Sequence, residues 1–88
     1  MFRTMIADDA DIAACLMALA KARGPGKSFC PSEAARRLAA DWRPLMPDIR
    51  RVAATLPLLA MQNGQIVDPL TARGPIRLRI ADGKTLAR

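Results

Sequence analysis

The dipeptide Asn63-Gly64 lies between two short apolar segments and marks a tight reversal of the chain. Asn and Gly best tolerate the positive φ angles that both central positions of a two-residue hairpin turn require. We therefore expect antiparallel strands over residues 58–62 and 65–67. Residues 76–80 alternate Ile, Arg, Leu, Arg and Ile, which is the period of a further strand with one apolar and one basic face.

Three helices are predicted before this hairpin, over about residues 9–22, 31–40 and 47–56. Asp8 is the expected N-cap of the first helix, and Gly24 is its stop. Pro31 suits the first position of the second helix. The third helix ends before Pro57, because a proline disfavours helical geometry in the residue before it.

Helices followed by a hairpin and a basic strand are typical of a winged helix. Residues 28–30 are expected to add a short strand that pairs with residues 76–80. Eighty-eight residues bury one small core, so we expect a single domain over residues 1–88. The predicted fold is mainly α with a small antiparallel sheet (α+β), with three helices and a β-hairpin wing. Residues 41–46 form a longer link than a simple helix-turn-helix has, and Trp42 is expected to seal it against the core.

The third predicted helix has an apolar stripe that begins at Ile49 and faces the core. Arg50, Arg51 and Thr55 therefore point outward, where a winged helix places the residues that reach a DNA major groove. Asp48 precedes Arg51 by three residues and can neutralise it. An ordinary solvated helix face is therefore an equally physical interpretation.

The charge balance favours a polyanionic partner. Lys and Arg number 14 against 8 Asp and Glu, a net charge of +6, and the surplus lies in residues 21–51 and 73–88. A soluble, arginine-rich surface is the alternative interpretation. On the second predicted helix, Glu33 and Arg37 are four residues apart and are expected to pair, whereas Arg36 has no such partner.

Catalysis finds little support in this composition. The chain has no His, and Cys15 and Cys30 share no metal or redox spacing, so we expect no enzyme, no cofactor and no metal site. Gly26-Lys27-Ser28 resembles the tail of a phosphate-binding loop, but the first glycine of that motif is missing. The spacing of the two cysteines leaves a disulfide open, although a reduced cytoplasmic protein is the expectation.

Export and membrane insertion are also disfavoured. The apolar run 12–20 is too short to span a bilayer. It ends like a secretory signal, but the acidic residues at 8, 9 and 11 fit the start of a helix better than the start of a signal peptide.

Four blocks follow one another in the chain: CPSEAARRL at 30–38, WRPLM at 42–46, DIRRVA at 48–53 and RGPIRLRI at 73–80. Together they resemble an uncharacterised bacterial domain-of-unknown-function family of small winged-helix-like proteins. The resemblance implies a fold and no activity. By resemblance, the motif positions are Arg36, Trp42, Arg43, Arg50, Gly74, Pro75 and Arg77.

These observations lead to one functional hypothesis and one alternative. The hypothesis is binding of double-stranded DNA, with the third helix and the basic strand contacting phosphates and groove edges. The alternative is a protein–protein interaction or assembly module that binds no nucleic acid. The sequence leaves the oligomeric state open. The candidate nucleic-acid-binding residues are Arg36, Arg43, Arg50, Arg51, Thr55, Arg77 and Arg79.

Overall fold

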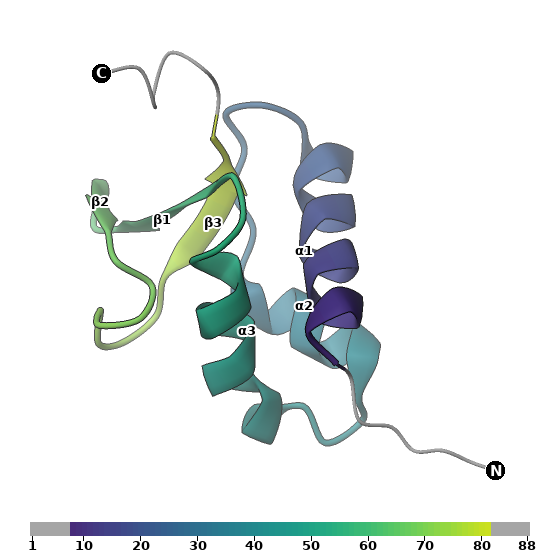
Figure 1. The fold of residues 1–88 in the computed structure, drawn as a ribbon. Helices are drawn as coiled ribbons and strands as arrows, with labels where there is room; N and C mark the ends of the chain where they lie inside the picture. The colour runs from purple at the N-terminus through teal and green to yellow at the C-terminus, as the bar shows by residue number, and fades with distance from the viewer. Residues whose placement is uncertain (1–7, 82–88) are drawn as a thin grey trace, which may run out of the picture.

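The computed structural model describes residues 8–81 and shows an α+β fold in which three helices pack beside a three-stranded antiparallel sheet (Figure 1). The predicted fold class is confirmed at this level. Residues 1–7 and 82–88 of the expected 1–88 domain lie outside the described range. In chain order the elements are α1 (Asp9–Arg23), α2 (Pro31–Leu38), the 3-10 turn η1 (Arg43–Leu45), α3 (Met46–Ala53), β1 (Leu58–Gln62), β2 (Gln65–Val67) and β3 (Arg77–Ile80).

Both ends of α1 follow from local sequence. The Asp8 carboxylate accepts a hydrogen bond from the Asp11 amide at 2.9 Å, and the Asp11 carboxylate accepts one from the Asp8 amide at 3.4 Å. This reciprocal capping satisfies two of the amides that a helix start leaves unpaired. At the other end, Gly24 adopts a φ of 91° and its amide bonds to the Ala20 carbonyl at 3.1 Å. The predicted cap and stop are confirmed.

The second and third helices are shorter than predicted. The prediction that α2 reaches residue 40 was wrong, because Ala39 is already extended, with φ −155° and ψ 144°. Helix α3 ends at Ala53, where the chain tightens. The Thr55 amide and hydroxyl both donate to the Val52 carbonyl, at 2.9 and 2.7 Å, and the helical pattern stops there.

The hairpin has the predicted turn and strands. Asn63 and Gly64 have φ angles of 53° and 79°, and the register pairs Gln62 with Gln65. The strand order is β2-β1-β3, with both neighbours antiparallel to β1. Phe29 and Leu78 exchange two backbone hydrogen bonds of 2.8 Å. The predicted pairing of residues 28–30 with the last strand is therefore confirmed as a single bridge.

The core lies between the helices and one face of the sheet. Ile12, Leu16 and Ile49 are fully buried from the helices, and Phe29 and Leu78 meet them from the bridge. Trp42 packs on the edge of this cluster, as expected of the residue that closes the link before α3. Among the described residues, no helix combines the length and the apolarity that crossing a membrane requires.

The two faces of the sheet differ in chemistry. Ala60 and Leu78 are paired and belong to the buried core on the helix side. Because neighbouring residues of a strand alternate between faces, Arg77 and Arg79 lie on the opposite face, paired with Met61 and Leu59. The basic face of β3 is therefore turned away from the helices.

The positive φ at Gly64 predicts a measurable effect of adding a side chain there. A Cβ at this position meets no atom within 4 Å, so the Gly64→Ala change tests backbone strain alone. We expect the free energy of unfolding to fall by about 1 kcal/mol, measured by urea denaturation. The exposed Gln65→Ala change on the same hairpin is the control. A Gly64→Ala variant with the same free energy of unfolding as the wild type would contradict the assigned turn.

Candidate nucleic-acid interface

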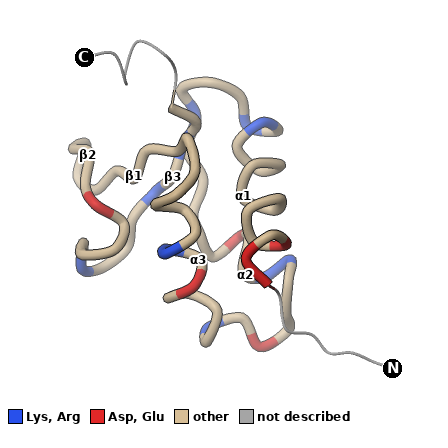
Figure 2. Tube along the Cα trace, viewed as in Figure 1, with Lys and Arg blue, Asp and Glu red and all other residues tan. Residues whose placement is uncertain are grey.

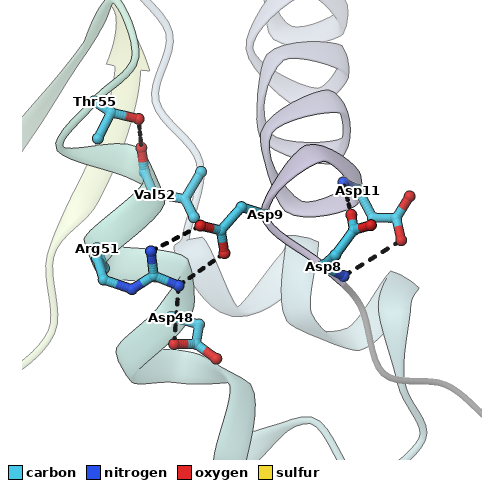
Figure 3. Close-up of polar contacts among 7 residues, drawn as sticks. All are labelled: Asp8, Asp9, Asp11, Asp48, Arg51, Val52 and Thr55. Carbon is cyan, nitrogen blue, oxygen red and sulfur yellow. Dashed lines mark hydrogen bonds and ion pairs between the residues drawn. The ribbon is translucent and has the colours of Figure 1, made fainter.

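Arg51 is exposed on α3, and Ala54 and Thr55 are exposed just after the helix ends at Ala53. The predicted outward direction is confirmed for Arg51 and Thr55, whereas Arg50 is half-buried. The Thr55 hydroxyl donates to the Val52 carbonyl, so it helps to terminate the helix (Figure 3). Its exposed position leaves the oxygen free to accept a second bond. The distinctive group on this face is the Arg51 guanidinium.

Arg51 is held by two carboxylates from different helices. Its Nη1 and Nη2 donate to Asp9 at 2.9 and 2.7 Å, and Nη2 also donates to Asp48 at 3.2 Å (Figure 3). The hydrogen bonds from Arg51 hold the pKa of Asp9 below its ordinary value, and the Asp9 carboxylate raises the pKa of Arg51. The predicted Asp48–Arg51 pair is confirmed, and the Asp9 contact adds a tether between α1 and α3.

Arg50 reaches in another direction and bonds to the β2–β3 loop (residues 68–76). Its Nη1 donates to the Ala72 carbonyl and its Nη2 to the Gly74 carbonyl, both at 2.6 Å. We call these two contacts the Arg50 bridge. The bridge leaves the guanidinium charged, with its planar fork already occupied by two carbonyls.

Gln62 complements the Arg50 bridge. Its Nε2 donates to the carbonyls of Arg73 and Pro75, at 2.5 and 3.1 Å. Four successive loop carbonyls, from residue 72 to residue 75, are therefore taken alternately by Arg50 and Gln62. Gly74 adopts a φ of 83° within this stretch, so the loop bends there. The loop is fixed between α3 and β1 without secondary structure of its own.

Arg73 lies in this fixed loop and its side chain is exposed. In the sequence it stood in a segment that was predicted only to connect two strands. The Arg50 bridge places the residues on either side of it against α3. Arg73 is thus a cation beside α3 that sequence reasoning missed, and no periodic signal in the sequence pointed to it.

Arg36 and Arg43 meet at Trp42. Their guanidinium carbons lie 4.8 and 4.7 Å from the centroid of the indole ring, within the range of cation–π attraction. Within residues 8–81 neither arginine makes an ion pair with a carboxylate. This tryptophan cluster, defined as Arg36, Trp42 and Arg43, spans the link from α2 to α3, and Arg43 lies just before α3 begins.

The two arginines of β3 do not join the cations around α3. Arg77 donates to the Ser28 hydroxyl at 3.0 Å and to the Ser28 carbonyl at 2.9 Å, so it fixes the segment that pairs with β3. Arg79 lies half-buried on the outer sheet face. The basic strand was predicted to contact DNA together with the third helix, but among the described residues its two arginines lie on the sheet face turned away from the helices.

The predicted pair between Glu33 and Arg37 was wrong. Glu33 instead forms an ion pair with Arg23, at the end of α1, and its Oε2 accepts the Cys30 amide at 3.2 Å. The Arg23 guanidinium lowers the pKa of Glu33, helped by the Cys30 amide. The packing of α1 on α2 brings this partner closer than the one on the same helix, and Arg37 stays exposed.

A family model described as "Protein of unknown function (DUF3253)" matches residues 9–81. The chain belongs to the DUF3253 family. The resemblance inferred from the four sequence blocks is confirmed, and the match covers nearly all of the described fold. The search of curated proteins finds no match to this chain.

The residues that carry the family resemblance make the contacts described above. In this DUF3253 domain Arg50 forms the bridge to Ala72 and Gly74, and Arg77 binds Ser28. Arg36 and Arg43 stack on Trp42. These residues at the motif positions therefore make contacts that stabilise the fold.

The Arg50 bridge predicts a stability effect. The Arg50→Ala change removes two charge-assisted bonds and leaves two carbonyls without their donor, so the free energy of unfolding should fall by about 2 kcal/mol. Arg50→Lys should recover little, because an ammonium lacks the planar fork. Urea denaturation measures the free energy of unfolding of both variants. In Arg50→Ala, the hydrogen exchange of backbone amides in residues 72–74 should also become faster. Arg37→Ala, an exposed change on α2, is the control. If Arg50→Ala lowers the free energy of unfolding no more than Arg37→Ala does, the Arg50 bridge is contradicted.

Proposed function

We propose that this DUF3253 domain is a winged helix that binds double-stranded DNA through α3 and the β2–β3 loop. The observation that carries the proposal is the Arg50 bridge, which fixes a loop containing an exposed arginine, Arg73, beside the outward face of α3. A helix and a basic loop held side by side form a surface that fits the groove and backbone of a duplex.

The order of elements supports the winged-helix part of the proposal. A strand segment at Phe29 lies between α1 and α2, and α3 leads directly into β1. Strand β3 lies between Phe29 and β1. Strand β2 is then an addition at the outer edge of the sheet, and the β2–β3 loop takes the place of the wing.

Cations flank α3 on two sides. Arg73 lies in the loop on one side, and the tryptophan cluster supplies Arg36 and Arg43 beyond the N-terminal end of α3. Figure 2 shows basic segments in the loop, on α3 and in the turn before it, along the lower left of the molecule. We assign phosphate contacts to these residues, because phosphate recognition needs charge and reach more than fixed direction.

The ion pairs of Arg51 determine which type of DNA contact we propose. Because Asp9 and Asp48 both bind its guanidinium, one positive charge faces two negative ones, and the free protein presents no net positive charge at this point of α3. DNA has to compete with two carboxylates for this side chain. We therefore propose that phosphate contacts dominate and that base recognition by α3 is weak.

A duplex titration tests the proposal. Binding of a fluorescent duplex, followed by anisotropy at several salt concentrations, should weaken with salt. The Arg43→Ala, Arg73→Ala double variant should lose about two units from the log–log salt slope, about 0.9 for each phosphate contact. Arg50 is left intact because its loss would unfold the loop.

The matched control is Lys21→Ala with Lys27→Ala. It removes the same charge near the C-terminal end of α1 and in the loop that follows. It should change the slope less than the Arg43, Arg73 double variant does. Equal effects of the two double variants would show binding without a defined surface, and no binding by the wild type would overturn the proposal.

The pairing of Arg51 also favours a second candidate function, docking on another protein through α3. A surface without net positive charge, with Ala54 and Thr55 exposed just after α3, suits a protein partner better than a polyanion. In this case Asp9 and Asp48 are part of the docking surface. In the DNA case they only oppose binding.

Removing the carboxylates distinguishes the two candidates. The Asp9→Asn, Asp48→Asn variant frees Arg51, so duplex affinity should rise about fivefold beyond that of a control with the same charge. The control is Asp8→Asn with Asp11→Asn, which keeps the cap of α1, because Asn caps as well as Asp. These two side chains lie away from Arg51 (Figure 3). Equal affinities of the two variants would favour the protein-docking function.

A further inference from the structure

Strand β2 is the open edge of the sheet and carries an exposed apolar side chain. Ile66 is 58% exposed, and Leu70, in the loop that follows, is 59% exposed. Within residues 8–81 these are the exposed large hydrophobic residues. Ile66 lies in β2, whose outer side has no neighbouring strand among the described residues.

The hairpin register determines which backbone groups this edge offers. A two-residue turn is closed by a hydrogen-bonded pair, here Gln62 and Gln65. Such pairs alternate with non-hydrogen-bonded ones along an antiparallel ladder. The next pair, Met61 and Ile66, is therefore non-hydrogen-bonded, so the amide and the carbonyl of Ile66 point away from β1. The free edge presents one donor and one acceptor on the residue whose side chain is exposed.

Charge limits what can approach this edge. The chain carries a net charge of +6, so two copies repel over most of their surfaces. Residues 52–67 contain no charged side chain at all. This stretch includes the whole hairpin, so the β2 edge is a place where a second copy meets no like charge.

We propose that two copies of this chain associate through their β2 edges, antiparallel about a two-fold axis at Ile66. The two Ile66 residues then exchange a pair of backbone hydrogen bonds, and their side chains cover each other. In this register residue 65 faces 67, and Asp68 faces Gly64 of the second copy. The same edge is used twice, so it is complementary to itself, as a two-fold contact requires.

The contact is small and predicts weak association. Three-residue strands with one apolar side chain each fall in the low range of interface size, where complexes dissociate readily. A second copy brings to this edge an uncharged strand with an exposed Ile66 of its own, so both the backbone groups and the apolar side chain of each Ile66 find a partner. A second copy is therefore the occupant that this edge fits best. The inference does not depend on DNA binding.

Analytical ultracentrifugation of the full chain tests the association. In reducing buffer, since Cys15 and Cys30 are free thiols, the weight-average mass should rise from 9.5 kDa toward twice that value. The rise is expected between about 10 µM and 1 mM, the range of small interfaces. The Ile66→Lys variant should stay at the monomer mass, because a charged residue on an edge strand opposes pairing.

The Ala14→Lys variant is the control, because it adds the same charge at an exposed position of α1, outside the surfaces proposed for binding. It should associate like the wild type, and circular dichroism should show the same fold in all three proteins. A wild type that stays monomeric over the whole range overturns the inference and leaves the edge for another chain. Association of Ile66→Lys equal to that of the wild type, or equal loss in both lysine variants, also overturns it.

Discussion

The Arg50 bridge is the contact on which the candidate surface depends. Without it, the β2–β3 loop has Gln62 as its only described side-chain partner along residues 72–75. The loop has no helix or strand of its own, so its position is determined by side chains that bind its carbonyls. Because α3 provides the main donor, the helix and the loop move as one unit. That unit is the surface proposed to meet DNA.

Arginine serves two purposes in this small domain. A guanidinium can bridge two carbonyls, pair with two carboxylates or stack on an indole, and each of these arrangements occurs here, at Arg50, Arg51 and the tryptophan cluster. These contacts link segments that a core of one Trp and few other aromatics leaves weakly joined. The charges remain after the contacts form, so a fold held by arginines is also a basic surface.

The sequence predicted the helices and strands better than it predicted which side chains pair with each other. The hairpin followed from the positive φ that Asn63 and Gly64 tolerate, and the start of α1 from the capping of Asp8, because both are decided within four residues. Arg51 binds Asp9 from 42 residues away, and a long side chain reaches many partners at similar cost. Glu33 is a second example, because in the packed structure it pairs with Arg23 on α1 and not with the expected Arg37 on α2. Fold class and the local Asp48–Arg51 pair were therefore predictable, whereas the partners that the arginines find in distant segments were not.

The central claim is that α3 and the β2–β3 loop together form the surface that meets a duplex. The most direct test is an NMR titration of the isotope-labelled chain with a short duplex, which reports every backbone amide at once. The account predicts shifts that concentrate in residues 50–55 and 72–74, with the side-chain signal of Arg51 among them. Shifts confined to β2 and the outer sheet face, or no shifts at all, would contradict it.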